Sequence, residues 1–469
     1  MSETSASNPH DFPDPLPLRP IPEGEKFDAS IRPPGSKSLT NRALLLAALA
    51  DGESILRGAL IGADDTLRMT EALRTLGADI RLVLPDAVHV RGVGGCWRVP
   101  PEGVTLNMNN AGTATRFLAA AALLSPAPIT IDGNERMRER PIGELAEALH
   151  ALGAGIRWLG VKGCPPLRIE PPAPDEIGDD VSFGRTQSSQ FISAMLLVGP
   201  WLPGGLTIRL TAEPTSRSYV QMSLEMLARL GAAVRTSADL RVLRVTPQWS
   251  SATSDKSRGV EPFEIEIEPD ASSATYFWAA AALCPHSRIR IVGLPEESMQ
   301  GDSDFPELLA RMGARLTNAP DGSGIVVQGP TRLRPILADM SNMPDAAVTL
   351  AVVAAFADGT SVIRGVRTLR VKETDRIAAL RTELAKVGVS LTSDVHADPD
   401  TMTITPPVGG IDCSAGVERV AFDTYRDHRM AMALALFGLR RPNVWINDPS
   451  CVNKTFPTYW QQLATLSPA

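Results

Sequence analysis

The sequence lacks the cysteine spacing on which disulfide scaffolds and structural zinc sites depend. It has five cysteines in 469 residues, an odd number, and no C-x-x-C pair. Secreted disulfide-rich domains and structural zinc sites both need regularly or closely spaced cysteines. We therefore expect neither disulfides nor a bound metal, and we interpret most of the cysteines as small buried hydrophobic residues. They are Cys96, Cys164, Cys284, Cys413 and Cys451.

Long hydrophobic runs are also missing. Apolar stretches such as residues 43–50 fall well short of the roughly 20 residues that a membrane-spanning helix needs. Residues 1–20 are rich in Ser, Pro and Asp and have neither the basic start nor the apolar segment of a secretory signal. We expect residues 1–20 to form a disordered tail, and the protein to be cytoplasmic with no membrane partner.

Positive charge is not in excess. The chain has 46 Lys and Arg residues against 53 Asp and Glu residues, a formal net charge of −7. Such a surface repels a phosphate backbone on average, which argues against a nucleic-acid partner. The average does not show whether cations gather in one place.

What the chain does contain is a repeated pattern. A phrase of the type Leu-x-x-Leu-Gly-Ala, with small variations, occurs five times at spacings of 75 to 82 residues. Each copy is typical of the last turn of an amphipathic helix, ended by a Gly in the left-handed conformation and followed by a strand. A single copy would be an ordinary helix end, but five at this spacing indicate a structural repeat. The copies begin at Leu73, Leu149, Leu227, Leu309 and Leu384, and residues 457–466 predict a sixth helix without the Gly.

A second series of helices lies between these phrases. In each, a polar cluster opens an Ala/Leu-rich helix that is followed by a turn and a β-like run. The two series together predict six α/β units of two helices and a small sheet each. The Ser/Thr-rich interval 249–259 predicts a flexible loop near the midpoint, and a boundary close to residue 268 leaves three units on each side. The second-series helices begin near Gly35, Asn110, Gln187, Asp270, Pro344 and Asp427.

Cations gather at the predicted helix starts. Capping explains the Ser, Thr, Asn and Asp residues there, but not the Lys and Arg residues beside them. A cation in the first turn opposes the helix dipole at about 0.3–1 kcal/mol, so its repeated use indicates bound anions. The charged and polar residues in question are Lys37, Arg42, Arg116, Arg136, Arg140, Gln190, Asp345, Lys372, Arg376, His428, Arg429 and Lys454.

Seven segments resemble the signature segments of the 5-enolpyruvylshikimate-3-phosphate synthase family, in family order from about residue 31 to the C-terminus. The first is PGSKSLTNRALLLAALA at residues 34–50, and the second is NAGTATR at residues 110–116. The others are Ser188–Phe191, Pro344–Ala347, Val371–Arg376, Asp427–Met432 and Lys454–Pro457.

The resemblance implies a fold of two inside-out α/β domains, each built from three repeated units. The helix starts of both domains would face a shared cleft. The first domain would span residues 36–268. The second, discontinuous domain would combine residues 21–35 with residues 269–469.

The resemblance also implies a reaction and its catalytic residues. The enolpyruvyl group of phosphoenolpyruvate would move to the 5-hydroxyl of shikimate 3-phosphate by addition and elimination, with release of phosphate. Asp345 would be the base at the hydroxyl, Glu373 the proton carrier at the methylene carbon, and Lys37 the donor to the leaving phosphate. The structural alternatives are a helix N-cap for Asp345 and a first-turn dipole partner for Glu373.

The binding residues that the resemblance implies fall into two sets. The shikimate 3-phosphate set is Lys37, Ser38, Arg42, Ser188, Ser189, Gln190, Ser216, Tyr219, Asp345 and Lys372. The phosphoenolpyruvate set is Lys37, Gly112, Arg136, Gln190, Arg376, Arg429 and Lys454, and Gly112 would leave room for a ligand near the backbone. Auxiliary residues would be Asn110, Arg116, His428 and Thr368.

Two of these auxiliary residues carry alternatives. Thr368 stands where many family members have Asn near the shikimate phosphate, so the affinity for this substrate is expected to differ. His428 would assist proton transfer or serve as a hydrogen-bonded structural residue.

Two other functions stay open at this point. One is enolpyruvyl transfer to UDP-N-acetylglucosamine, although the cysteine typical of that family's mobile loop is absent from residues 134–140. The other is a non-catalytic anion-binding relative. We expect no cofactor and no nucleic-acid partner, a monomer, and competition between glyphosate and phosphoenolpyruvate.

Overall fold

The computed structural model describes residues 12–83, 87–247, 259–319 and 324–467. The chain divides into two compact units. Unit 1 comprises Met1–Pro33, Asp270–Ser298 and Asp302–Ala469, and unit 2 comprises Pro34–Pro269 and Met299–Gly301. The chain therefore changes unit after residues 33 and 269, whereas the sequence-based division lies after residues 35 and 268. A short excursion at residues 299–301 is an addition that the sequence did not indicate.

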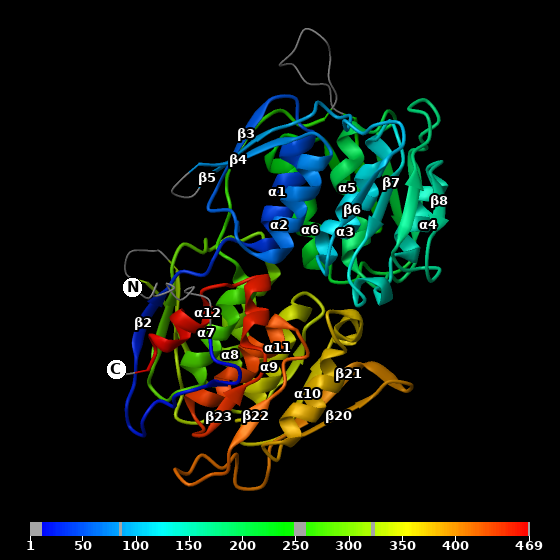
Figure 1. Cartoon of the computed structure of the whole chain (residues 1–469). Coiled ribbons are helices and arrows are strands. Elements are labelled where there is room, and N and C mark those ends of the chain that lie inside the picture. Colours follow the sequence, from blue (N-terminus) through cyan, green and yellow to red (C-terminus); the bar gives the residue numbers. More distant parts are fainter. Residues whose placement is uncertain (1–11, 84–86, 248–258, 320–323, 468–469) are drawn as a thin grey trace, which may run out of the picture. The chain divides into compact units, whose positions relative to one another are not determined.

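Unit 2 is built around three buried helices, each paired with a helix that is only partly buried. Ser36 starts the first buried helix, because its side-chain oxygen accepts a hydrogen bond from the Leu39 amide at 3.5 Å. Residues 43–49 are all Ala or Leu, and they are buried through to the helix end. Figure 1 shows these helices inside the unit, with strands toward its outside. The buried helices are α1 (Lys37–Leu49), α3 (Gly112–Ala121) and α5 (Ser189–Val198), and their partners are α2 (Asp64–Thr75), α4 (Gly143–Ala151) and α6 (Arg217–Arg229).

Three four-stranded sheets cover these helices. In each, the strand that follows a buried helix pairs in parallel with one neighbour and antiparallel with the other. Strand β11 shows why the sheets sit outside, since alternate residues are buried and the others face outward. The strand orders are β14-β3-β5-β4, β6-β7-β9-β8 and β10-β11-β13-β12. The bounds are β3 (Glu53–Arg57), β4 (Asp79–Val83), β5 (Ala87–Arg91), β6 (Val104–Asn107), β7 (Ile129–Asp132), β8 (Gly155–Trp158), β9 (Leu167–Glu170), β10 (Asp180–Phe183), β11 (Leu206–Leu210), β12 (Val234–Thr236), β13 (Val242–Val245) and β14 (Glu264–Glu266).

Unit 1 repeats the same plan. Its buried helices are α7 (Ala271–Leu283), α9 (Ala347–Ala354) and α11 (His428–Leu434), and their partners are α8 (Phe305–Arg311), α10 (Arg376–Ala385) and α12 (Tyr459–Ala464). The strand orders are β16-β17-β15-β2, β18-β19-β21-β20 and β1-β23-β22. The bounds are β1 (Leu16–Pro17), β2 (Asp28–Ile31), β15 (Arg288–Ile291), β16 (Arg315–Asn318), β17 (Ile325–Gln328), β18 (Leu337–Asp339), β19 (Ser361–Arg364), β20 (Ser390–Asp394), β21 (Asp398–Thr405), β22 (Val420–Phe422) and β23 (Val444–Ile446).

The six predicted repeats are confirmed in the described residues. Both helix series occur, and the glycine that ends each of the first five helices in the first series has a positive φ. Only a residue without a Cβ takes this conformation without strain, which is why the repeat phrase contains Gly. Strand β2 pairs in parallel with β15, so this early segment completes a sheet of unit 1. The five glycines are Gly77, Gly153, Gly231, Gly313 and Gly388.

Two predictions concern irregular segments, the tail at residues 1–20 and the loop at residues 249–259. The predicted disordered tail is wrong for residues 12–20, because Leu16 and Pro17 form strand β1 against β23 and the Leu18 amide donates to the Val444 carbonyl at 2.9 Å. Apolar residues at this end supply the packing that a solvated tail would lack. Residues 1–11, and the predicted loop 249–259 except its last residue, lie outside the described residues. No helix among the described residues is long and apolar enough to span a membrane.

Candidate functional site

In unit 1 two aspartates cap the helices that carry the predicted cations. Asp427 begins α11, and its Oδ1 accepts a hydrogen bond from the Arg429 amide at 2.8 Å. Asp375 begins α10 and accepts from the amides of residues 377 and 378. Each carboxylate therefore satisfies amides that a helix start leaves without partners. This capping fixes the first turns that carry Arg376, His428 and Arg429.

Arg376 is the centre of a buried ion cluster. Its Nε donates to Asp427 Oδ2 at 2.7 Å, its Nη1 to Asp345 Oδ1 at 3.1 Å and its Nη2 to Glu373 Oε2 at 2.8 Å. The Arg376 side chain is 1% exposed, so solvent screens these contacts little. Burial by itself lowers the pKa of Arg376, but the carboxylates of Asp427, Glu373 and Asp345 more than reverse this effect and raise it. The arginine is held in its charged form by three carboxylates.

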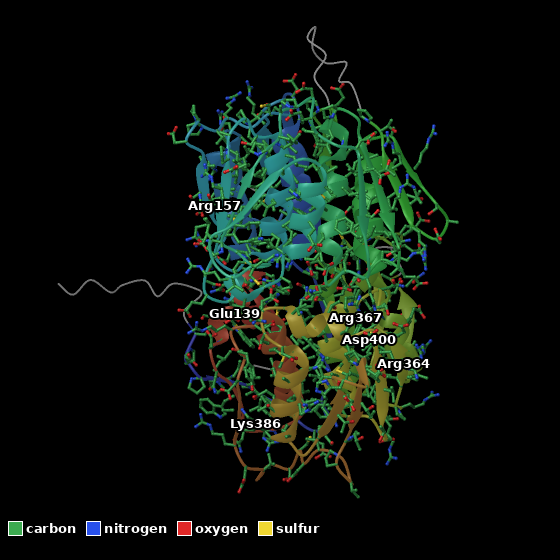
Figure 2. All side chains as sticks on the ribbon, turned by 90° about the vertical axis from the view of Figure 1, so that its right-hand side faces the viewer. Glu139, Arg157, Arg364, Arg367, Lys386 and Asp400 are labelled. Atoms are coloured by element: carbon green, nitrogen blue, oxygen red, sulfur yellow. The ribbon has the colours of Figure 1, made fainter. Side chains whose placement is uncertain are left out.

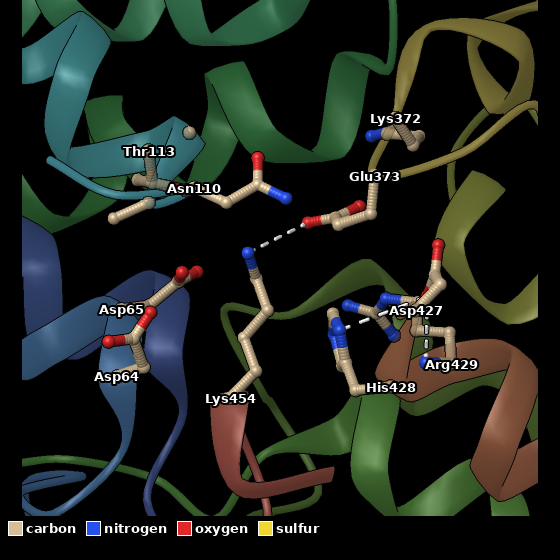
Figure 3. Close-up of polar contacts among 12 residues, drawn as sticks. Asp64, Asp65, Asn110, Thr113, Lys372, Glu373, Asp427, His428, Arg429 and Lys454 are labelled. Atoms are coloured by element: carbon tan, nitrogen blue, oxygen red, sulfur yellow. Dashed lines mark hydrogen bonds and ion pairs between the residues drawn. The ribbon is translucent and has the colours of Figure 1, made fainter. Parts of the chain in front are cut away.

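The other cations of unit 1 complete the cluster. Asp345 also lies 3.3 Å from Lys372 Nζ and 3.2 Å from Arg429 Nη2. Glu373 lies 3.5 Å from Lys454 Nζ, as the dashed line between them in Figure 3 shows. Burial lowers the pKa of Lys372, and Asp345 opposes this shift.

The structural alternatives for the two predicted catalytic carboxylates are wrong. Asp345 lies inside the short 3-10 helix Pro344–Ala346, and the N-cap of α9 is Ala346. Glu373 precedes Asp375, the N-cap of α10, so it is not a first-turn residue of that helix. Both side chains instead pair with cations, which capping would not require.

Two buried titratable side chains, one acidic and one basic, lie beside the cluster. Asp302 is 3% exposed and accepts a hydrogen bond from the Ser272 hydroxyl at the start of α7. Burial raises the pKa of Asp302 to about 7, while Arg429 opposes the rise. His428 is also buried, with Nδ1 3.8 Å from Asp427 Oδ1.

The segment before Lys372 carries the departure from the family pattern. Thr368 lies in the 3-10 helix Arg367–Val371 and is buried. Asp400 anchors this segment, because its Oδ1 accepts from the Arg367 amide at 3.0 Å; Figure 2 labels both residues. The Thr368 hydroxyl has no hydrogen-bond partner among the described residues.

In unit 2, Lys37 at the start of α1 pairs with a residue that the sequence did not single out. Its Nζ lies 3.1 Å from Asp65 Oδ2, and the Asp65 side chain is buried at the start of α2. The neighbouring Asp64 points to other partners, Arg68 at 3.3 Å and Asn109 at 2.9 Å. Figure 3 labels both aspartates. The sequence feature that could have indicated this partner of Lys37 is the pair of adjacent acidic residues at the start of α2.

Arg42 is buried in the interior of unit 2 among neutral acceptors. Its Nε donates to Ser223 Oγ at 2.8 Å, and its Nη2 donates to Ser193 Oγ and to the Tyr219 carbonyl. Its Nη1 donates to the Ser38 carbonyl at 2.9 Å. Burial lowers the pKa of Arg42 to about 10. Three helices far apart in the sequence, α1, α5 and α6, thus meet at one guanidinium.

The starts of α5 and α6 bring further predicted residues into unit 2. Ser188 caps α5 by accepting from the Gln190 amide at 3.2 Å, and Ser189 follows it. The Gln190 side chain donates to Thr113 Oγ1 at 3.1 Å, which joins the starts of α5 and α3. Ser216 precedes α6 in the left-handed conformation, with φ of 50°.

The loop before α4 contains Arg140, one of the cations near the predicted helix starts, to which the family resemblance assigns no ligand. Arg140 Nη1 donates to Asn110 Oδ1 at 3.0 Å. A Cβ added at Gly112 would lie 2.8 Å from the Arg140 guanidinium carbon. The end of the Arg140 side chain thus lies beside Gly112, and the role of Gly112 in ligand binding stays a prediction.

The remaining cations of this region face other partners. Arg136 Nη1 donates to Glu139 Oε2 at 2.8 Å within the same loop. Arg116 is buried, and its Nη2 donates to the Pro141 carbonyl at 2.8 Å. Among the described residues, no group of three or more His, Cys, Asp and Glu side chains is arranged to hold a metal ion.

Comparisons with known proteins show which chains this one is similar to. The family model described as EPSP synthase (3-phosphoshikimate 1-carboxyvinyltransferase) matches residues 21–463. A 3-phosphoshikimate 1-carboxyvinyltransferase from Aliivibrio salmonicida is 40% identical over 96% of this chain and 99% of its own length. One from Ralstonia pickettii is 41% identical over 92% of this chain and 95% of its own length. A solved structure of EPSP synthase from Acinetobacter baumannii is 25% identical, with a TM-score of 0.75 over 97% of this chain and 98% of that one.

Proposed function

Because this chain belongs to the EPSP synthase (3-phosphoshikimate 1-carboxyvinyltransferase) family, we propose that it transfers the enolpyruvyl group of phosphoenolpyruvate to the 5-hydroxyl of shikimate 3-phosphate, releasing phosphate. The observation that carries the proposal is the cluster in unit 1. Two carboxylates that cap no helix, Asp345 and Glu373, lie among four cations at the starts of helices and loops.

The substrates fit this chemistry. Both carry a phosphate and a carboxylate, so several cations are needed to bind them. Arginine can grip either group through two parallel hydrogen bonds, whereas lysine supplies a point charge. The cations assigned to phosphoenolpyruvate are Lys37, Arg136, Arg376, Arg429 and Lys454, with Gly112 and Gln190. Those assigned to shikimate 3-phosphate are Lys37, Arg42 and Lys372, with Ser38, Ser188, Ser189, Gln190, Ser216, Tyr219 and Asp345.

The reaction needs proton transfer in opposite directions. Asp345 takes the proton of the attacking 5-hydroxyl, and Glu373 delivers a proton to the methylene carbon of phosphoenolpyruvate, which gives a tetrahedral adduct. Glu373 then removes a proton from the same carbon while the carbon–oxygen bond to phosphate breaks, and Lys37 protonates the leaving phosphate. The contacts of Asp345 and Glu373 with cations support these roles, because they place both carboxylates beside the groups assigned to the substrate anions.

Phosphate release measured with both substrates, and with each omitted in turn, tests the proposal. We expect release only when phosphoenolpyruvate and shikimate 3-phosphate are both present. Asp345→Ala should lower turnover by about 10²–10⁴-fold with the fold intact, because it removes general base catalysis. Release with UDP-N-acetylglucosamine but not with shikimate 3-phosphate would contradict the proposal.

We also propose that the enzyme acts as a cytoplasmic monomer without a cofactor and that glyphosate competes with phosphoenolpyruvate. Activity that survives exhaustive dialysis against a chelator is expected, and so is a light-scattering mass of one chain. A loss of activity that a metal ion restores would contradict the absence of a cofactor. A light-scattering mass of two chains would contradict the monomer. Glyphosate should raise the KM for phosphoenolpyruvate without changing kcat.

A further inference from the structure

The two proposed proton carriers occupy the cations that the substrate anions need. Asp345 contacts Lys372, Arg376 and Arg429, all within 3.3 Å. Glu373 contacts Arg376 at 2.8 Å and Lys454 at 3.5 Å. Every one of the four cations of the cluster therefore has a carboxylate beside it.

A third carboxylate has a different position. Asp427 is 0% exposed, receives two hydrogen bonds from Arg376 and also caps the backbone of α11. Asp427 therefore accepts hydrogen bonds from a main-chain amide as well as from a side chain. Asp345 and Glu373 lie nearer to solvent, with side chains 14% and 7% exposed.

The charge balance follows from these contacts. Lys372, Arg376, Arg429 and Lys454 carry four positive charges, and Asp345, Glu373 and Asp427 carry three negative charges. An incoming phosphate or carboxylate meets a cluster with little net charge, in a buried place where each charge acts strongly. It gains full attraction only where it replaces a carboxylate on the cations.

We propose that Asp345 and Glu373, besides the proton-transfer roles on which this inference rests, are internal competitors of the substrate anion. In the unliganded protein they neutralise Lys372, Arg376, Arg429 and Lys454, and a bound anion takes over some of these contacts. The competition makes anion binding weaker than four cations would otherwise allow. It also releases the two carboxylates from the cations at the moment when the substrate arrives.

Calorimetric binding of inorganic phosphate and of phosphoenolpyruvate tests this, with no second substrate and hence no turnover. Glu373→Gln and Asp345→Asn keep the shape of each side chain but remove its charge. Both variants should bind the two anions more tightly than the unmodified enzyme, by about tenfold, because the competitor is neutralised. Both should turn over more slowly, so affinity and rate change in opposite directions.

Asp358→Asn is the matched control. Asp358 is exposed in the same unit and pairs with Arg332 at 3.7 Å, so its variant has the same loss of charge and also releases an arginine. Water screens this pair, and anion affinity should stay unchanged. Lys454→Met should bind both anions more weakly, which identifies the cluster as the binding place.

Unchanged or weaker anion binding in both amide variants, with thermal unfolding like that of the unmodified enzyme, would overturn the inference. An equal gain in Asp358→Asn would also overturn it, because the effect would then be one of net charge. The proposed function fails in a different way, through absence of phosphate release with both substrates while binding remains measurable.

Discussion

Each unit has one arginine among the largest fully buried side chains of the described residues, and these two arginines are held in opposite ways. Arg42 in unit 2 is 2% exposed and donates to hydroxyl and carbonyl oxygens, and burial lowers its pKa to about 10. Arg376 in unit 1 is 1% exposed and donates to three carboxylates, which raise its pKa. The same residue type therefore meets neutral oxygens in one unit and three carboxylates in the other.

The contrast between Arg42 and Arg376 shows how a carboxylate partner differs from a neutral one for a buried guanidinium. Neutral acceptors satisfy the hydrogen bonds of a buried guanidinium but leave its charge without a counter-ion. Carboxylates supply both the acceptor atoms and the counter-ion, and in our proposal they exchange places with a substrate anion. The following substitutions test this contrast, from the largest expected effect to the smallest.

Asp427→Ala should be the most damaging change. It leaves Arg376 with fewer counter-ions in a buried place and removes the cap of α11. Breaking a buried ion pair by removal of one partner destabilises by about 3–5 kcal/mol. Urea unfolding at neutral pH measures the loss, and a change below about 1 kcal/mol would show that the pair is not important for stability.

Asp302→Asn should change the dependence of stability on pH. Burial raises the pKa of Asp302 from 3.8 to about 7, so between these values the folded protein keeps a proton that the unfolded chain has released. The free energy of unfolding therefore falls as pH rises from about 4 to about 7, by up to about 4 kcal/mol over the range. The Asn variant cannot ionise, and its stability should fall less over this range.

Urea unfolding of both proteins at pH 4.5, 6 and 7.5 measures the two slopes. Asp304→Asn provides a control, since Asp304 lies in the same short helix and is less buried. Parallel pH profiles for Asp302→Asn and the unmodified protein would show that Asp302 ionises normally in the folded state.

Ser223→Ala should have a smaller effect in unit 2. It removes the acceptor of Arg42 Nε and leaves a buried donor without its partner. Such a loss typically destabilises by about 1–3 kcal/mol. Chemical unfolding should show a smaller loss than for Asp427→Ala, and a larger loss would reverse the contrast between neutral and charged partners.

Asp358→Asn should have the smallest effect. It breaks an exposed pair with Arg332, and exposed pairs contribute about 0–1 kcal/mol. The melting temperature should change little at low salt and not at all at high salt. A marked loss would show that the surface pair is not screened by water.

The repeats could be predicted because their signals are local. Each first-series phrase places a glycine directly after an apolar residue at the helix end, and Gly77 has the positive φ that this position needs. The starts of the buried helices were equally readable, since capping residues such as Ser36 precede an Ala/Leu run. The ordered segment at residues 12–20 was missed because its only strand has two residues and pairs with β23 at the far end of the chain.

The candidate site was predictable as a set of residue types and not as a set of pairs. The cations at the helix starts were found, but Asp65 and Asp427 were not, because each acts through a partner on another helix. The partner of Arg42 is 181 residues away, and Arg140 reaches a glycine on another element. Contacts between residues so far apart in the chain cannot be predicted from their spacing in the sequence.

The sequence alone therefore determined the six repeats, the helix ends and the concentration of cations at helix starts, because backbone conformation and capping depend on neighbouring residues. Only the tertiary structure decided which cation meets a carboxylate and which meets a neutral oxygen, because packing of distant helices sets these distances. Arg42 and Arg376 look alike in the sequence, each near a helix start. Their surroundings give Arg42 neutral oxygen partners and Arg376 three carboxylates.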